Sequence, residues 1–420
     1  MNISNFSELG LAEPIQRALK SRDHTIPTPI QARAIPELLA GRDMLGIAQT
    51  GTGKTAAFAL PILQRLARGH ENRKPRSPRA LILAPTRELA IQIGEEFRAY
   101  GKFLHLRHVV IFGGVSQVPQ VKALGRGVDI VVATPGRLLD LMNQRQISLG
   151  AVEYLVLDEA DRMLDMGFVR DVRKIIAAMP RARQSLLFSA TMPSAVERLS
   201  GDILSNPVRI EVTPPATPIE RLEQRVYHVN SPDKMALLAT ILKDPACSRV
   251  IVFSRTKHRA NRIAERLAKW GVSADAIHGN KSQGARQRAL KRFRAGEARV
   301  LVATDIAARG IDVDKVSHII NFELPNEAES YVHRIGRTAR AGAGGAAFSF
   351  CDASERGYLR DIERLIKRRL TVVGEEPPPP ANDDRSEGQD RPSRGAPRHR
   401  RNRSRNGGRN RRQAGNRLSA

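Results

Sequence analysis

Short apolar runs alternate along the chain with longer helical patterns. Each run is four or five residues long, as expected for strands that are buried on both faces. In the first half they cover 80–84, 129–133 and 154–158, and in the second half 250–253, 300–303 and 318–321. Buried strands separated by helices are typical of βαβ units and parallel sheets. The pattern predicts an α/β protein with two domains in tandem.

Two segments interrupt this alternation. Residues 213–218 contain three prolines, which continue neither a helix nor a central strand, so we expect a linker there. From 375 a polyproline stretch leads into a segment without apolar periodicity, which predicts disorder. The expected organisation is therefore a first domain over 1–212, a second over 219–374 and a tail over 375–420.

The composition indicates which classes of protein the chain can belong to. Of 420 residues, 41% are hydrophobic, which is enough for sizeable cores. No run approaches the ~18 apolar residues that would cross a bilayer. The beginning of the sequence shows no secretory signal pattern. The two cysteines, Cys247 and Cys351, have neither disulfide-framework nor metal-site spacing. We expect a soluble protein of a reducing compartment, the cytoplasm, without membrane association.

The charge points to a polyanionic partner. The net charge is +26, and the last thirty residues carry eleven arginines and no acid. The rest of the chain is also basic.

A phosphate-binding loop is indicated after the predicted strand 43–47. The string Ala48-Gln49-Thr50-Gly51-Thr52-Gly53-Lys54-Thr55 opens a helix expected near Ala56. Glycines let backbone N–H groups surround a phosphate at a helix N-terminus. Lys54 would reach the β- and γ-phosphates, and the Thr55 hydroxyl would bind Mg²⁺. Ala48 stands where the strict pattern has glycine, and a Gly/Thr-rich turn is the alternative.

A second acidic position follows the apolar run that ends at Leu157. Asp158 can hold Mg²⁺ through water, and Glu159 can polarise the attacking water. Taken alone, the two acids fit a solvated turn before a helix equally well. Together with the loop, they predict that the first domain binds and hydrolyses a nucleoside triphosphate.

The string Asp158-Glu159-Ala160-Asp161 spells D-E-A-D, and the sequence resembles the DEAD-box RNA helicases. Further motifs of that family appear in order along the chain, before and after this string: 6–31 (Q motif), 85–89, 113–114, 134–137, 189–191, 252–256, 283–286, 303–312 and 333–340. The basic tail is most similar to the bacterial RhlE-type subgroup. The resemblance implies two RecA-like domains and ATP-dependent RNA unwinding or remodelling, with ATP and Mg²⁺ as cofactors.

The sequence departs from the family pattern at three places. Asp23 and His24 stand where the Q motif has a glycine and an aromatic residue, and Ala339 replaces a glycine. If that glycine needs a positive φ, alanine there has an energetic cost. The third departure, Ala48, is ordinary for this family. None of the three removes a charged or ligating group.

The resemblance also implies individual roles at the nucleotide. Gln31 would read the adenine edge, Phe6 would stack on the base and Asp312 would bind the ribose. Arg337 and Arg340 would act as arginine fingers. The alternatives are a helix-start glutamine, a core aromatic residue and a solvated basic turn. Arg334 is interpreted as part of an ordinary ion pair on the domain surface.

RNA contacts are expected from both domains, through the phosphates and therefore without sequence preference. They are Arg87, Gly113, Gly114, Thr134, Gly136, Arg137, Thr256, Arg286 and Thr304. Ser189, Thr191 and His333 would couple the nucleotide and RNA sites. The alternatives are turn residues shaped for folding and, for Ser189 and Thr191, a helix cap.

Three functions remain open from the residues. The first is an ATP-dependent RNA helicase, with ribosomal or RNA-decay complexes as possible settings. The second is an RNA chaperone or scaffold that works mainly by binding through its tail. The third is a DNA translocase. The intact charged motif residues disfavour the second hypothesis, and the D-E-A-D string with its Q motif disfavours the third.

Overall fold

Each half of the chain folds around a parallel sheet. The computed structural model describes residues 4–48, 51–68, 74–212, 222–308, 313, 315–338 and 345–374. Within these residues there are two seven-stranded sheets, one built before residue 213 and the other after residue 221. The linker 213–218 and the tail from 375 lie outside the described residues.

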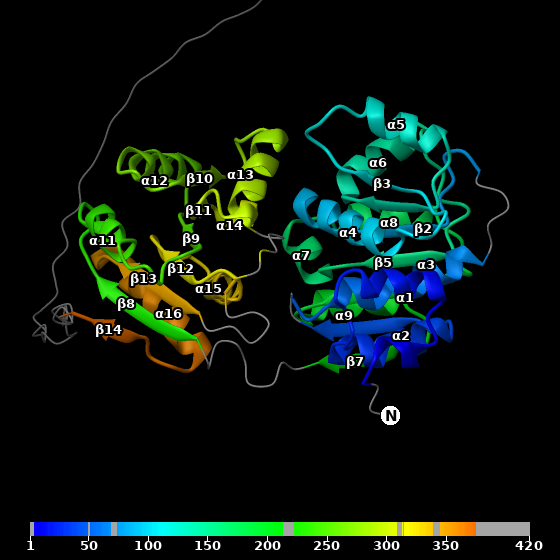
Figure 1. The fold of residues 1–420 in the computed structure, drawn as a ribbon, viewed down its shortest axis with the longest axis horizontal. Helices are drawn as coiled ribbons and strands as arrows, with labels where there is room; N and C mark the ends of the chain where they lie inside the picture. The colour runs from blue at the N-terminus through cyan, green and yellow to red at the C-terminus, as the bar shows by residue number, and fades with distance from the viewer. Residues whose placement is uncertain are drawn as a thin grey trace, which may run out of the picture. The chain divides into compact units, whose positions relative to one another are not determined.

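The first domain contains strands β1 to β7 and the helices between them (Figure 1). The strands are β1 (Met44–Ala48), β2 (Ala80–Leu83), β3 (His108–Ile111), β4 (Ile130–Ala133), β5 (Tyr154–Leu157), β6 (Gln184–Ser189) and β7 (Val208–Val212). The helices are η1 (Phe6–Leu9), α1 (Glu13–Lys20), α2 (Pro29–Leu39), α3 (Lys54–Ala67), α4 (Arg87–Tyr100), α5 (Val118–Gly125), α6 (Pro135–Asn143), α7 (Ala160–Asp165), α8 (Val169–Ala177) and α9 (Ser194–Ile203).

The second domain repeats this alternation. Its strands are β8 (Glu223–His228), β9 (Val250–Phe253), β10 (Ala274–Ile277), β11 (Val300–Ala303), β12 (His318–Asn321), β13 (Ala346–Cys351) and β14 (Thr371–Val373). Its helices are α11 (Lys234–Ile241), α12 (Lys257–Lys269), α13 (Gln283–Ala295), α14 (Asp305–Ala308), α15 (Ala328–Ile335), η2 (Ala353–Glu355) and α16 (Arg356–Ile366).

The two sheets share one strand order. The first runs β3-β4-β2-β5-β6-β1-β7 and the second β10-β11-β9-β12-β13-β8-β14. Counted from the first strand of each domain, these orders are identical, and the strand pairs are parallel. Because parallel strands end at the same edge of a sheet, the loops that follow neighbouring strands meet there.

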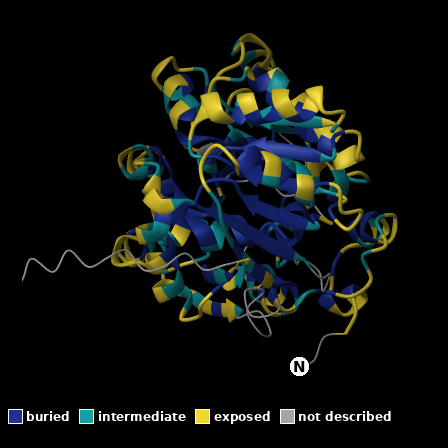
Figure 2. Ribbon diagram, turned by 90° about the vertical axis from the view of Figure 1, so that its left-hand side faces the viewer, coloured by how far each residue is buried: buried dark blue, intermediate teal, exposed yellow. Residues whose placement is uncertain are grey.

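Helices cover both faces of each sheet, so the strands lie in the core (Figure 2). In the second domain, α11 and α12 pack on one face and α13, α15 and α16 on the other. The apolar runs 80–83, 130–133, 250–253 and 300–303 are completely buried, which explains their lack of polar alternation.

The strand predictions are confirmed to within one residue at each end. The runs 250–253, 300–303 and 318–321 match β9, β11 and β12, and the other predicted runs match β1, β2, β4 and β5. The helix expected near Ala56 begins at Lys54.

Candidate functional site

Three strand ends of the first domain bring the candidate nucleotide residues together. β5, β6 and β1 are neighbours in the sheet. The loop that contains Lys54 follows β1, Asp158 follows β5, and Ser189 ends β6. Residues more than a hundred positions apart in the sequence therefore meet at one sheet edge, which is where α/β sheets bind their ligands.

Glycine is required in the loop after β1. Gly51 and Gly53 have φ of 87° and 91°, a conformation that other residues adopt at a cost. A Cβ on Gly53 would also lie 2.4 Å from Nε2 of Gln31. Thr52 and Thr55 are half-buried, and Thr50 lies outside the described residues. The loop thus has the backbone shape that leaves room for a phosphate.

Lys54 is held at the start of α3. Its buried Nζ donates to the carbonyl oxygen of Ala48 at 3.0 Å and lies 4.0 Å from Oδ1 of Asp158. A buried ammonium with one carbonyl and one distant carboxylate has donor capacity left for a phosphate.

Gln31 connects the Q-motif region to this loop. Its Oε1 accepts from the backbone N–H of Thr28 at 2.9 Å, and its Nε2 donates to the carbonyl oxygen of Gly53 at 3.1 Å. The helix-start interpretation therefore holds, yet one N–H and one lone pair of the amide remain for a base. Phe6 packs in the hydrophobic core.

The two acids after β5 have different electrostatic surroundings. Burial is the largest influence on Asp158 and raises the pKa of its carboxyl to about 6, although the Lys54 charge opposes it. Burial would also raise the pKa of Glu159, but Arg162, Lys54 and Arg337 outweigh burial and lower it. Glu159 is therefore ionised at neutral pH, as a group that polarises water must be.

Arg162 holds Glu159 in place, a role that the sequence analysis missed. Its buried guanidinium pairs with Oε2 of Glu159 at 2.7 Å. Glu159 itself has φ 54° at the N-terminus of α7, a strained conformation for a side chain of this size. The spacing of three residues on a helix is the signal that could have predicted this pair.

Asp161 binds the 189–191 segment, and it too was missed as a site residue. Its Oδ2 accepts from the backbone N–H groups of Ala190 and Thr191 and from the Thr191 hydroxyl, at 3.0–3.1 Å. Its own N–H donates to the Ser189 hydroxyl at 3.3 Å. The two predicted coupling residues of the first domain, Ser189 and Thr191, are thus hydrogen-bonded to the D-E-A-D segment.

The second domain contributes His333, which lies within α15, and Arg337, which lies two residues after the helix ends. Arg337 is buried. Burial lowers the pKa of its guanidinium to about 9, the Arg162 charge adds to this effect and the Glu159 charge opposes it. His333 lines a small pocket with Arg337 and Asp305. Arg340, Asp312 and Ala339 lie outside the described residues.

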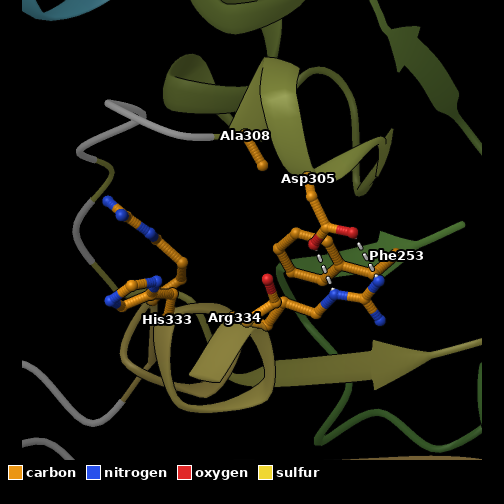
Figure 3. Close-up of a pocket in the computed structure, with 7 residues that line it drawn as sticks. Phe253, Asp305, Ala308, His333 and Arg334 are labelled. Atoms are coloured by element: carbon orange, nitrogen blue, oxygen red, sulfur yellow. Dashed lines mark hydrogen bonds and ion pairs between the residues drawn. The ribbon is translucent and has the colours of Figure 1, made fainter. Parts of the chain in front are cut away.

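The interpretation of Arg334 as a surface residue is wrong. Only 1% of it is exposed, and its guanidinium forms two bonds to Asp305, at 2.6 and 2.7 Å (Figure 3). It also donates to the side chain of Asn321 and to the carbonyl oxygen of Glu323, and it lies over the Phe253 ring. A short motif does not reveal burial, so the sequence left this organising role unseen.

The RNA candidates of the first domain follow β2, β3 and β4, the other half of the sheet. Arg87 begins α4 and fills the space beside Gly114, where a Cβ would lie 2.2 Å from Nη1 of Arg87. Thr134 is the N-cap of α6, followed by the exposed Gly136. Arg137 donates to the carbonyl oxygen of Val115. Gly113 is half-buried.

The RNA candidates of the second domain follow the strands equivalent to β2, β3 and β4, namely β9, β10 and β11. Thr256 is the N-cap of α12 after β9, and Thr304 precedes α14 after β11. Arg286 lies on α13 after β10, with its Nε 3.0 Å from Oε1 of Glu88. In each domain the RNA candidates therefore follow the same three strands, so the strand order gathers them at one end of the sheet edge.

Comparison with known proteins identifies both domains. The family model "DEAD/DEAH box helicase" matches residues 28–199, and "Helicase conserved C-terminal domain" matches 233–342. The "DEAD-box ATP-dependent RNA helicase CshA" of Bacillus cereus is 42% identical over 389 residues, which cover 93% of this chain and 72% of the relative. The "ATP-dependent RNA helicase CshA" of Listeria monocytogenes is 43% identical over 368 residues, 88% of this chain and 70% of the relative. Since these relatives are named CshA, the RhlE-type subgroup stays a prediction.

Solved structures agree. Dbp5 of S. cerevisiae, bound to RNA and ADP BeF3, is 33% identical with a TM-score of 0.76, over 88% of this chain and 96% of that one. A DEAD box protein from Methanococcus jannaschii is 39% identical with a TM-score of 0.52, over 89% and 99%. The expected pair of RecA-like domains is confirmed. Among the described residues, no helix has the length and apolar character to span a bilayer.

Proposed function

Because the chain belongs to the DEAD-box family of ATP-dependent RNA helicases, we propose that the residues gathered at the ends of β1, β5 and β6 are its ATP-hydrolysing site. The protein is an RNA-stimulated ATPase that unwinds or remodels RNA. The proximity of Lys54, Asp158 and Glu159 at one sheet edge carries the assignment.

The nucleotide is held from both ends. The N–H groups of residues 50–53 and Nζ of Lys54 bind the phosphates at the N-terminus of α3. The free N–H and lone pair of Gln31 bind the adenine edge, which offers one acceptor and one donor. The family pattern assigns Phe6 to stacking on the base and Asp312 to binding the ribose; because Phe6 is buried in the core of the first domain, its ring must turn outward to reach a base.

The donor set at this edge fits Mg²⁺. A hydroxyl from Thr55 and a carboxylate from Asp158 are the oxygen ligands that this ion prefers, with Asp158 acting through water. When bound, Mg²⁺ neutralises charge on the phosphate oxygens. Asp158 must be ionised to hold it, and the adjacent Lys54 charge favours that form.

Hydrolysis then depends on charges of this chain. Glu159, kept ionised by Arg162, orients and polarises the attacking water. Arg337 and Arg340 cover the charge that develops on the transferred phosphoryl group. Ser189 and Thr191, tied to Asp161, transmit the state of the nucleotide toward the RNA residues, and His333 does so from the second domain.

RNA binds along the other strand ends through its phosphates. Backbone N–H groups at helix N-termini and small or basic side chains suit phosphate oxygens and carry no base information. The contacts are Arg87, Gly113, Gly114, Thr134, Gly136, Arg137, Thr256, Arg286 and Thr304. Binding is therefore sequence-independent.

The remaining parts of the proposal concern organisation and setting. The domains comprise 1–212 and 219–374, joined by the linker 213–218 and followed by the tail 375–420. The protein acts in the cytoplasm, in ribosomal or RNA-decay complexes, where structured RNA is the substrate. Crosslinking of RNA in cells, followed by purification of the full chain, tests this setting.

Two variants test the active site. Lys54→Ala should abolish RNA-stimulated ATP hydrolysis, and Glu159→Gln should lower kcat about 10²–10⁴-fold with ATP binding retained. Lys243→Ala, which removes an exposed lysine of the second domain, is the matched control. Retained turnover in Lys54→Ala would show that the loop is misassigned. RNA restructuring by Glu159→Gln at the wild-type rate would favour a protein that works by binding.

A further inference from the structure

Helix α12 presents a basic face that the proposed function does not use. Its apolar side, formed by Ala260, Ile263, Ala264 and Leu267, is buried against the second sheet. Its outer side has side chains that are exposed to solvent, namely Lys257, His258, Arg259, Arg262, Glu265, Arg266 and Lys269. Five cations and a single acid make this face strongly positive.

Four of the cations form a straight stripe. Arg259, Arg262, Arg266 and Lys269 are three, four and three residues apart, which places them along one side of the helix. Arg259 pairs with Glu323 at its start. Among the described residues, no carboxylate lies within ion-pair distance of Arg262, Arg266 or Lys269. Their charges are therefore directed to solvent rather than used to stabilise the fold.

The stripe ends at Trp270, the single tryptophan of the sequence. This residue is 48% exposed, and the guanidinium of Arg266 lies 5.7 Å from the centroid of its ring. An exposed indole beside unpaired cations is the combination that single-stranded nucleic acid needs, because a base stacks on the ring while its phosphates meet the cations.

The stripe begins at a residue already placed in the RNA site. Thr256 caps the N-terminus of α12, and its position after β9 puts it among the RNA candidates. From Thr256 to Trp270 the helix rises about 20 Å. A stacked strand that rises about 3.4 Å per nucleotide covers this distance with about six nucleotides.

We propose that RNA leaving Thr256 continues along α12, with its phosphates on Arg262, Arg266 and Lys269 and a base stacked on Trp270. The inference rests on the proposed assignment of Thr256 to the RNA site. It gives the helicase an extended single-strand track on the second domain, which adds affinity for long RNA without adding sequence preference.

Intrinsic fluorescence tests the track directly, since all tryptophan emission comes from position 270. The full chain, in the presence of a non-hydrolysable ATP analogue, is titrated with three RNAs. One is a short oligouridylate, and the other two are the same RNA lengthened by about six nucleotides at its 5′ end or at its 3′ end. The short RNA should leave the emission unchanged. Lengthening at one end should quench it and tighten binding. Unchanged emission with both lengthened RNAs overturns the proposal. This is also the result expected if the stripe binds an acidic protein instead of RNA.

Variants separate this surface from general charge. The triple variant Arg262→Gln, Arg266→Gln and Lys269→Gln should flatten the salt slope for the lengthened RNA by about two units and leave the short RNA unaffected. Trp270→Ala should weaken binding of the lengthened RNA about 5- to 140-fold. The control is a second triple variant, in which the exposed Arg360, Arg368 and Arg369 are replaced by glutamine. These residues lie on α16 or just after it, and α16 covers the face of the second sheet opposite to α12.

Equal weakening by the two triple variants would overturn the track. Stimulation of the ATPase by the short RNA reports separately on the proposed function. If the short RNA fails to stimulate hydrolysis, the RNA assignment at Thr256 is wrong. If the short RNA stimulates hydrolysis but the lengthened RNAs leave the emission unchanged, the proposed track along α12 is wrong and the RNA assignment of Thr256 is retained.

Discussion

At the scale of single residues, Asp158 shows a conflict between folding and chemistry. Its carboxyl is buried, and its raised pKa of about 6 means that ionisation at neutral pH costs folding free energy. We expect Asp158→Asn to abolish ATP hydrolysis and to raise the free energy of unfolding by on the order of 1–3 kcal/mol at pH 7. Denaturant titration measures this difference.

The stability advantage of Asp158→Asn should depend on pH. The folded-state pKa lies above the unfolded value of about 3.9, so the folded wild type takes up a proton as pH falls from about 6 to 4. The charge penalty disappears over that range, and the stability advantage of Asp158→Asn should shrink with it. If Asp158→Asn were less stable than the wild type at pH 7, the attraction between Asp158 and Lys54 would outweigh the cost of burying the Asp158 charge.

Arg162 determines the protonation of its neighbour Glu159. Arg162 is the largest of the charges that lower the pKa of Glu159, so Arg162→Gln should leave that pKa higher than in the wild type, shift the acid limb of the kcat profile to higher pH and lower kcat about 10²-fold. Arg162→Lys keeps the charge and should retain the wild-type limb. A lower kcat with an unmoved limb would show that Arg162 acts only through packing.

Chemistry carried by a local motif could be predicted from the sequence, whereas burial and long-range pairing could not. The types of Lys54, Asp158 and Glu159 and their spacing indicate phosphate and magnesium chemistry without a structure. Arg334 was misread because its bonds reach Asp305 and Asn321, which only the folded sheet brings close. The individual roles proposed for site residues remain predictions until variants are measured.

At the scale of elements, the loop after β3 and the start of α4 depend on one glycine. Gly114 has φ 76°, and a Cβ there would lie 2.2 Å from Nη1 of Arg87. Gly114→Ala should therefore displace the Arg87 guanidinium and raise the apparent KM for RNA about 10- to 150-fold, because a charged hydrogen bond contributes about 1.5–3 kcal/mol.

Gly125→Ala is the control for this change, since nothing lies within 4 Å of a Cβ at the end of α5. RNA-stimulated ATPase assays compare the two variants. An unchanged KM for Gly114→Ala would remove Arg87 and Gly114 from the RNA site.

Most interior strands were predicted from the sequence, whereas the edge strands and the interior strands β6, β8 and β13 were not. β2, β4, β9 and β11 are continuous apolar runs because both faces are covered. β3, β10 and β7 are only partly buried, and polar residues such as His108 and Asp275 dilute their pattern. The shared strand order of the two sheets depends on pairing between distant segments, which no local pattern encodes.

At the scale of the whole molecule, the proposed catalytic site takes residues from both domains. Arg337 comes from the second domain, and the charges that shift its pKa, Arg162 and Glu159, come from the first. We expect Arg337→Ala to bind ATP nearly as wild type and to lower kcat about 10³–10⁵-fold, because the finger acts on transition-state charge. Arg337→Lys should not rescue the rate, since an ammonium lacks the planar fork. A raised KM for ATP with kcat intact would mean that Arg337 binds only the ground state.

The tail tests whether RNA affinity extends beyond the two domains. Deletion of 391–420 removes eleven arginines and none of the residues of the described cores, so stability and basal ATPase should be unchanged. Each neutralised phosphate contributes a salt slope of about −0.7 on single strands. If half of the arginines contact RNA at once, truncation should flatten the log–log slope of affinity against salt by about three to four units.

Affinity at moderate salt should then fall and the apparent KM for RNA should rise, while kcat per bound complex changes little. A chain with all eleven tail arginines replaced by lysine keeps the charge and should keep most of the slope, because counterion release depends on charge rather than on base contacts. Superimposable salt lines for the full and truncated chains would mean that the tail is no tether. The affinity for RNA would then come from the strand ends of the two sheets and from the basic face of α12.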